Sequence, residues 1–443
     1  MKGWGWICVT SVLLGGVGSS AAEDPVALVR RTFADGFYDV AARQADDALC
    51  AGVTAVQSNE LLVLAGRSYL AMGRLSNAVN VLQLVRGEGG APEGYAEGLY
   101  WLGQAYEQQG DMPRALFSYE AALSEAPATR AGREAAMAAA RIYLRRDQAS
   151  RAYGVLSNAV ARAGGEASVE LHFALGQAAL ACRTFAEARR ILEYVLAYTT
   201  DSVLQAYATC ALGAAELALG EATNGVARLA SLCATPGPAL AQAMARYYLG
   251  HMALMRGATN EAREWLLPNV TNHWHEGEED GRVVSVRTGF PIADSLLLLG
   301  QMALTTAPAE ARRWLTRCVG EYPQAAVSDH ATLALALLDV QEGAVERARQ
   351  RVRPLTQHER QDIRVASLLL AGDLARASSN FNEAAELYVA AAVLASNETA
   401  GAEAQLRAAA AAGIRMYRLQ HMHYDLKKPI KAQVANYTAQ LKD

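Results

Sequence analysis

Lysine is almost missing from this sequence. Only five of its 443 residues are lysine, and none of them lies between Lys2 and Lys427. A glycine-rich loop that cradles nucleotide phosphates needs a lysine, followed by serine or threonine, to reach those phosphates. ATP hydrolysis by such a loop is therefore excluded for the whole stretch between these two lysines.

A surplus of positive charge is missing as well. The 41 basic residues are outnumbered by 45 acidic residues, so the formal net charge is -4. It becomes -5 when Lys2 is removed, since one positive charge is lost. Proteins that hold nucleic acid by its phosphates need a basic surface, so we expect no nucleic-acid partner.

Signatures of catalysis are also lacking. The sequence contains neither a G-x-S-x-G nucleophile elbow nor an H-E-x-x-H zinc helix. Four histidines stand singly, without a nearby cysteine or serine constellation: His172, His251, His330 and His358. We therefore predict that the protein is not an enzyme and that it has no cofactor and no metal centre.

Cysteine is sparse, and its number beyond residue 22 is odd. Five cysteines remain there, namely Cys50, Cys182, Cys210, Cys233 and Cys318, and they do not form the pattern of a disulfide framework. The repeat described below brings Cys210 and Cys233 to facing ends of one helical hairpin. The sequence leaves open whether these two form a disulfide or serve as small buried hydrophobic residues.

Long apolar runs are confined to the N-terminus. After Met1 and Lys2, an apolar stretch over 4–17 leads to small residues at Ser20 and Ala22. This pattern predicts a secretory signal peptide over 1–22, which is too short to span a bilayer comfortably. An uncleaved anchor is the alternative. We expect a soluble mature protein, exported across the inner membrane to the periplasm or cell envelope.

A spacing of 36 or 37 residues recurs along the rest of the chain. Small residues mark its anchor positions, with a single longer step of 50: Val29, Gly66, Gly103, Ala140, Gly176, Gly213, Gly250, Gly300, Ala336, Gly372 and Ala409. A small residue follows twelve positions after most anchors: Ala78, Ala115, Ala152, Ala188, Gly225, Ala262, Ala348 and Ala384. A glycine follows seven positions after several: Gly36, Gly73, Gly110, Gly220, Gly257 and Gly343.

These offsets predict one helical hairpin per period. A small anchor lets the first helix approach the second closely, and the small residue twelve positions later meets it from the other side. The glycine seven after the anchor ends the first helix in a left-handed backbone conformation. In Gly110–Pro113 the proline falls in the first turn of the second helix, where its missing N–H does no harm.

The repeat around Gly103 resembles the tetratricopeptide pattern. The residues that carry the resemblance are Leu99, Leu102, Gly103, Tyr106, Gly110, Ala115, Tyr119, Ala122 and Pro127. Leu99 stands where that pattern prefers tryptophan, and the period exceeds the usual length of about 34. The resemblance implies an all-α protein over 23–424, an α-solenoid that forms a right-handed superhelix of about ten hairpins, each covering the apolar face of its neighbour.

Tetratricopeptide arrays bind peptides or helices on a concave face that is lined by the first helix of each hairpin. Residues one after and three before each anchor are the candidates for this lining, which gives a ligand-binding groove of Arg67, Tyr100, Gln104, Arg141, Phe173, Gln177, Tyr247 and His251. Donors with aromatic anchors between them suit an acidic or backbone-carbonyl ligand. Alternatively, the rings fill space between adjacent helices and the polar residues are only solvated.

Two segments depart from the period. The step of 50 places an insert at about 269–291, either a short hairpin or a loop, in which His273, His275 and the acids of 276–280 offer divalent-metal ligands or simply a solvated loop. The tail over 425–443 caps the last hairpin or, as the alternative, contacts a membrane. Membrane association is expected only through this tail or an uncleaved leader.

Together these observations predict a non-catalytic scaffold in the cell envelope that binds a protein or peptide partner. A glycan- or nutrient-binding surface protein on the same scaffold is one alternative, but it needs aromatic platforms, and aromatics are only 7% of the residues. A helical accessory part of a murein-processing system is another. A murein-cleaving enzyme itself would need a compact non-repeating domain. The sequence specifies neither the partner nor an oligomeric state.

Overall fold

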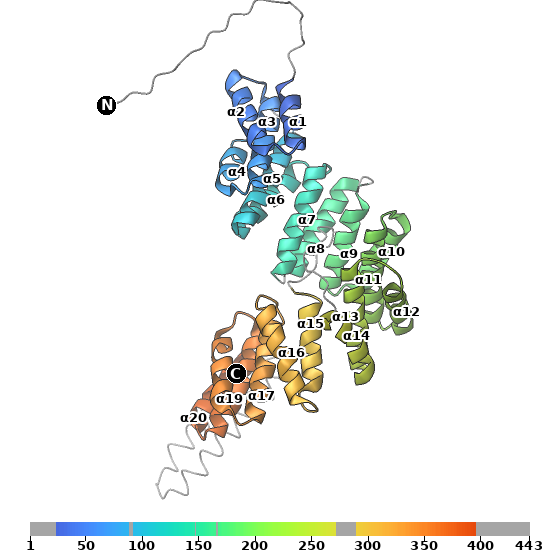
Figure 1. Ribbon diagram of the computed structural model, residues 1–443, viewed down its shortest axis with the longest axis vertical. Helices are drawn as coiled ribbons and strands as arrows, with labels where there is room; N and C mark the ends of the chain where they lie inside the picture. Colours follow the sequence, from blue (N-terminus) through green and yellow to red (C-terminus); the bar gives the residue numbers. More distant parts are fainter. Residues whose placement is uncertain (1–23, 88–91, 147, 165–166, 272–288, 396–443) are drawn as a thin grey trace, which may run out of the picture. The chain divides into compact units, whose positions relative to one another are not determined.

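The computed structural model describes residues 24–87, 92–146, 148–164, 167–271 and 289–395 (Figure 1). These residues form twenty α-helices and a 3-10 helix, and no strand occurs among them. The predicted all-α fold is therefore confirmed. The predicted leader over 1–22, the metal-ligand candidates of 273–280 and the predicted cap over 425–443 lie outside the described residues.

Consecutive helices pair into hairpins, as the period predicts, and nine such pairs are in contact among the described residues. Two compact units contain them: residues 1–142 with 154–167, and residues 143–153 with 168–443. The first unit holds α1 (Pro25–Ala34), α2 (Tyr38–Ala51), α3 (Ala55–Ala71), α4 (Leu75–Leu82), α5 (Pro92–Gln109) and α6 (Met112–Glu125). Both α7 (Arg130–Arg145) and α8 (Ala149–Ala163) contribute residues to both units.

The second unit continues the same order of helices. It holds α9 (Val169–Ala181), α10 (Phe185–Tyr198), α11 (Ser202–Ala218), α12 (Ala222–Ala234), α13 (Ala239–Met255), α14 (Thr259–Thr271), α15 (Ile292–Ala303), α16 (Pro308–Glu321), α17 (Ser328–Gln341), α18 (Val345–Val352), η2 (Arg353–Gln357), α19 (Gln361–Ala377) and α20 (Phe381–Leu394). Each even-numbered helix pairs with the odd-numbered helix before it.

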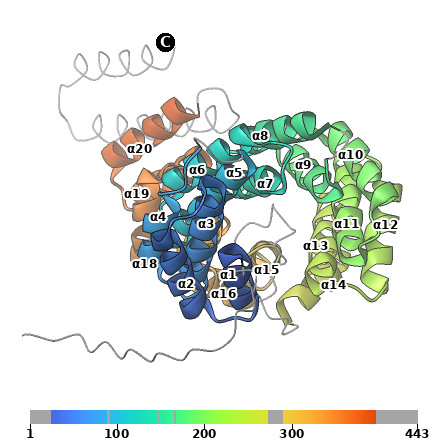
Figure 2. The same cartoon turned by 90° about the horizontal axis from the view of Figure 1, so that it is seen from above.

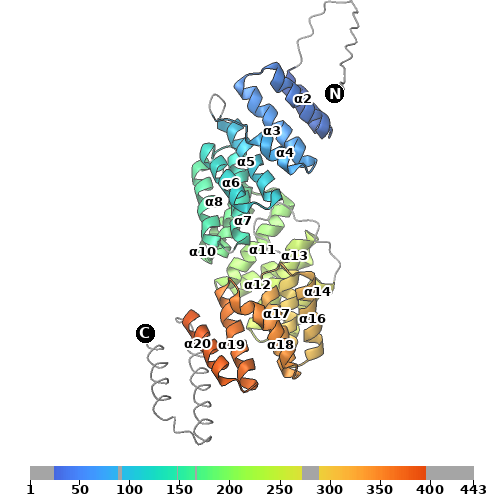
Figure 3. The same cartoon turned by 90° about the vertical axis from the view of Figure 1, so that its left-hand side faces the viewer.

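Within each unit the first helices of successive hairpins pack on one another. In the first unit α3 contacts α1 and α5 as well as its own partner α4, and Figure 3 shows α3, α4 and α5 following one another. In the second unit α11 and α13 are in contact, and Figure 2 shows α12 on the outer side of both. The hairpins thus stack in two layers of helices, which is the arrangement of an α-solenoid.

The glycine anchors allow a close approach of the two helices of a hairpin. A Cβ atom added at Gly66 would lie 2.4 Å from Leu82 Cγ, and one added at Gly103 would lie 2.5 Å from Tyr119 Cε1. Both partners stand sixteen residues after the anchor. The small residue twelve positions after the anchor also allows the close approach, since a Cβ atom added at Gly225 would lie 2.9 Å from the Gly213 carbonyl oxygen. The contact with the large residue sixteen positions after the anchor was not predicted from the sequence.

The predicted glycine ends the first helix of several hairpins in a left-handed backbone conformation. Two hairpins have the same conformation at a residue other than glycine. The glycines seven after an anchor have positive φ, for example 83° at Gly110. Arg183 and Ser379 stand at the same offset from Gly176 and Gly372, and both have φ of 63°. A left-handed conformation costs a non-glycine residue about 1–2 kcal/mol, so the stacked hairpins impose this backbone on Arg183 and Ser379.

The predicted insert begins later than expected, because α14 continues through Pro268 to Thr271. Asn269 is buried in this last turn, and its Nδ2 donates to the Ala243 carbonyl oxygen at 2.8 Å. Cys210 and Cys233 are free thiols in this structure.

Candidate binding surface on the first helices

Arg67 lies between two aromatic rings that come from neighbouring first helices. Its guanidinium carbon is 4.8 Å from the centre of the Phe33 ring on α1 and 4.7 Å from that of the Trp101 ring on α5. Cation–π contacts of this kind contribute about 0.5–2 kcal/mol each. Because α3 packs between α1 and α5, this stack joins three consecutive hairpins of the first unit.

The hydrogen-bonding capacity of Arg67 is largely unused. Its Nη1 atom lies 3.7 Å from Glu97 Oε1, beyond hydrogen-bond distance, and its Nε atom is buried without a partner. The same Glu97 oxygen accepts from Trp101 Nε1 at 3.4 Å. The Arg67 side chain nevertheless stays 30% exposed. A charged donor group is therefore held rigidly at a surface that a ligand can reach.

The other predicted cation of this unit is already engaged. Arg141 Nη2 donates to both carboxylate oxygens of Glu107, at 3.1 and 3.0 Å, and the Tyr119 hydroxyl donates to Glu107 Oε2 at 2.8 Å. Tyr100 packs beside this network, with its ring centre 6.0 Å from that of Tyr119. Burial is the main cause that raises the pKa of Tyr100 to about 12, so its hydroxyl stays protonated at neutral pH.

The predicted groove residues of the second unit differ in accessibility. Phe173 is 0% exposed and Gln177 is 4% exposed, so both belong to the core of the second unit and not to its surface. Tyr247 is half-buried, with its ring centre 5.0 Å from Phe290 and 6.1 Å from His251, and His251 is exposed. The set therefore contains exposed, half-buried and core residues.

The first unit brings together residues that the sequence analysis did not combine. Arg67, Tyr100 and Gln104 were predicted, and each is half-buried on α3 or α5. Phe33, Glu97 and Trp101 were missed. A usable signal was present, since Phe33 stands four after the anchor Val29 and Trp101 two before Gly103, but using it requires placing the first helices side by side.

Buried acidic residues elsewhere form structural ion pairs. Glu216 accepts from Arg228 at 2.9 and 3.0 Å, and Asp339 accepts from Arg351 at 2.8 Å. In both hairpins the acid stands three after the anchor and the arginine twelve further. Burial by itself raises the pKa of Asp339, but hydrogen bonds from Arg351 and Arg312 outweigh it and hold this pKa below its usual range. These carboxylates tie the two helices of a hairpin together.

No group of three or more histidine, cysteine, aspartate or glutamate side chains in the part of the chain that is described is arranged to hold a metal ion. Among the same residues, no helix combines the length and the apolar character needed to cross a membrane.

Comparison with known proteins supports the repeat family. The model of the tetratricopeptide repeat family matches residues 96–129, which span most of α5, all of α6 and the turn that follows. This match supports the family assignment at the repeat where the resemblance was read. No curated protein matches the chain.

Several solved structures are similar to the chain. A tetratricopeptide repeat protein from Parabacteroides merdae is 16% identical, with 55% of this chain and 90% of that one covered and a TM-score of 0.38. The C-terminal part of a repeat protein from Cytophaga hutchinsonii is 9% identical, with coverages of 69% and 98% and a TM-score of 0.38. A monomeric variant of IFIT1 with m7Gppp-AAAA is 14% identical, with coverages of 94% and 89% and a TM-score of 0.43.

Proposed function

We propose that this protein is a non-catalytic interaction scaffold of the cell envelope and that it binds an acidic peptide segment of a protein partner. The binding surface is the first-helix face of the N-terminal unit, formed by Phe33, Arg67, Tyr100, Trp101 and Gln104. Tetratricopeptide repeats generally mediate contacts between proteins. The observation that carries the proposal is the arginine held between two rings without a hydrogen bond of its own.

The geometry around Arg67 favours a carboxylate ligand. The guanidinium carbon lies within 5 Å of the centres of both the Phe33 and the Trp101 rings, and a carboxylate binds a guanidinium at its edge, where the N–H groups point. A carboxylate at that edge forms charge-assisted hydrogen bonds, which are worth about 1.5–3 kcal/mol each. Such a ligand also accepts from the Arg67 N–H groups that Glu97, with its Oε1 atom 3.7 Å from Arg67 Nη1, does not bind.

Preorganisation strengthens this surface. Arginine normally loses side-chain freedom when it binds a ligand, at a cost of about 0.5–1.5 kcal/mol for one immobilised side chain. Here Phe33 and Trp101 already restrict the guanidinium before the ligand arrives. The half-buried Tyr100 and Trp101 then offer apolar surface to neighbouring residues of the peptide.

The location in the envelope rests on the apolar run and small residues of 1–22. Export is tested by fractionating cells that express the full chain and cells that express it without 1–22. We expect the full chain in the periplasmic fraction and the shortened chain in the cytoplasm. Equal distribution of the two would remove the envelope from the proposal.

Peptide binding is tested with arrays of short acidic, neutral and basic peptides. We expect the acidic peptides to bind the full chain and Arg67→Gln to weaken binding at least tenfold, which corresponds to about 1.4 kcal/mol. Arg43→Gln is the matched control, because Arg43 is an exposed arginine on α2 that pairs with Asp39 of its own helix. Equal affinity of the wild type and Arg67→Gln would contradict the proposed site.

A further inference from the structure

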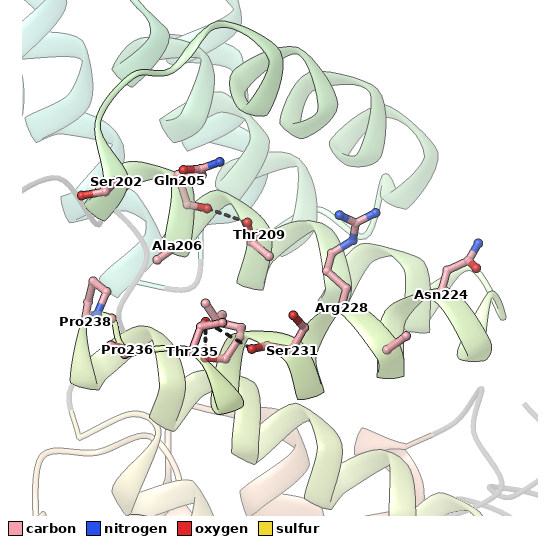
Figure 4. Close-up of a pocket in the computed structure, with 13 residues that line it drawn as sticks. Ser202, Gln205, Ala206, Thr209, Asn224, Arg228, Ser231, Thr235, Pro236 and Pro238 are labelled. Carbon is pink, nitrogen blue, oxygen red and sulfur yellow. Dashed lines mark hydrogen bonds between the residues drawn. The ribbon is translucent and has the colours of Figure 1, made fainter.

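A polar pocket of about 640 Å³ lies between the two helices of the α11–α12 hairpin in the second unit. Figure 4 shows Ser202, Gln205 and Thr209 of α11 opposite Ser231 and Arg228 of α12. This volume is within the range of small-molecule sites, about 300–1,000 Å³. The pocket belongs to the second unit and shares no residue with the surface around Arg67, which belongs to the first unit.

The repeat itself explains why this pocket is open. Counting from the anchor Gly213, the wall residues Thr209, Ser231 and Thr235 stand four before, eighteen after and twenty-two after it. The same offsets from Gly176 in the preceding hairpin give His172, Tyr194 and Tyr198.

In the preceding hairpin these positions are filled by rings. The ring centres of His172 and Tyr194 are 4.6 Å apart, and so are those of Tyr194 and Tyr198. In the α11–α12 hairpin three small hydroxyl residues replace the three rings. A space that side chains occupy in one repeat is therefore available to a ligand in the next.

The lining of the pocket is electrically neutral. It contains no carboxylate, and its one cation, Arg228, is engaged by Glu216 through two hydrogen bonds. The Glu216 side chain is only 5% exposed, so Arg228 pairs with a carboxylate that lies inside the protein. Most of the lining is exposed, and a charged ligand finds no unpaired opposite charge in it with which to form a salt bridge. The pocket selects a neutral ligand.

The polar groups of the lining both donate and accept. The side chains of Gln205 and Asn224 make no hydrogen bond to the described residues, so each offers an amide donor and a carbonyl acceptor. Thr209 and Thr235 donate to carbonyl groups of their own helices, so their oxygens remain as acceptors. A matching ligand carries several hydroxyl groups.

One rim of the pocket is held in place before any ligand binds. The segment Thr235–Pro238 contains two prolines, which restrict its backbone, and Gln242 Nε2 donates to the Thr235 carbonyl oxygen at 2.7 Å.

From these features we infer that the α11–α12 pocket binds a short neutral saccharide, with Gln205 and Asn224 as its main hydrogen-bonding residues. Neutral hydroxyl groups of a sugar can both donate to and accept from the amides of Gln205 and Asn224, and can donate to the threonine oxygens. A neutral peptide has fewer donors and acceptors per unit volume. It therefore leaves more of this lining unpaired.

The test uses the full chain and a panel of trisaccharides: maltotriose, cellotriose, xylotriose, mannotriose and tri-N-acetylchitotriose. Saturation-transfer NMR and calorimetric titration measure binding, and we expect millimolar affinity for at least one of them. Gln205→Ala combined with Asn224→Ala should weaken that binding about tenfold. Ser231→Tyr combined with Thr235→Tyr, which restores the side chains of the preceding hairpin, should abolish it.

The matched control is Gln301→Ala combined with Gln341→Ala, since both are exposed amides on first helices of the same unit and outside the pocket. It should bind like the wild type. The inference is overturned if no trisaccharide binds, if the tyrosine pair does not reduce binding, or if the neutral peptide Ac-Ala-Ser-Ala-Ser-Ala-NH2 binds in place of the sugars. Arg67→Gln separates the two sites, because it should leave saccharide binding unchanged.

Discussion

The contact between Gly66 and Leu82 predicts a specific loss of stability when the anchor is enlarged. A Cβ atom at Gly66 would lie 2.4, 2.5 and 2.9 Å from the Cγ, Cδ2 and Cδ1 atoms of Leu82, which is 2% exposed. Overpacking of this kind costs about 1–3 kcal/mol. Alanine is better than glycine within a helix by about 1 kcal/mol, so Gly66→Ala should lower the free energy of unfolding by up to about 2 kcal/mol.

The control is Gly94→Ala on α5, where an added Cβ meets nothing within 4 Å. It should be neutral or stabilising by up to about 1 kcal/mol. A compensating change is available, because the ninth hairpin pairs an alanine anchor, Ala336, with Val352 sixteen residues later. Leu82→Val alone should cost about 1 kcal/mol, but combined with Gly66→Ala it should cost less than the sum of the two single changes.

Urea unfolding followed by circular dichroism gives the overall effect, and hydrogen exchange of the α3–α4 hairpin shows that the loss is local. Hydrogen exchange is needed because stability in a repeat array is a sum over units and their interfaces. The reasoning is refuted if Gly66→Ala stabilises the protein as much as Gly94→Ala does, or if the double variant loses the full sum.

Two further predictions concern the turns and the histidines. Arg183→Gly should raise the free energy of unfolding by up to about 1 kcal/mol, because glycine adopts the φ of 63° without strain; an unchanged urea midpoint would contradict this. Burial and, after it, the charge of Arg360 hold the pKa of His330 below its ordinary value of 6.5, and Asp362 and Asp329 oppose this effect. Since the folded state disfavours the protonated ring, stability should fall as the pH drops below about 6.5, and His330→Gln should reduce this fall in urea unfolding at pH 7 and pH 5.

The sequence predicts the fold because its period encodes packing directly. A small anchor, a small residue twelve later and a glycine at seven locate both helices and the turn of most hairpins, and Pro113 falls in the first turn of α6 as expected. The left-handed backbone at Arg183 and Ser379 was not predicted from the sequence. Their left-handed backbone comes from the stacking of the hairpins and not from the residue type.

The candidate site was predicted less completely, since it depends on contacts between repeats. A count from each anchor selects the correct helix but does not separate a surface position from one that the next hairpin covers. Phe173 and Gln177 are buried for this reason, because α9 packs against both α10 and α11. Likewise, the neighbours of Arg67 come from α1 and α5, and the pattern within α3 alone does not reveal them.

Hydrogen exchange of the full chain with a bound acidic peptide tests the central claim most directly. If the first-helix face of the N-terminal unit holds the ligand, peptide should slow exchange in α1, α3 and α5 around Phe33, Arg67 and Trp101, and Arg67→Gln should remove this protection. Protection confined to α2, α4 and α6, or protection that persists unchanged in Arg67→Gln, would contradict the claim.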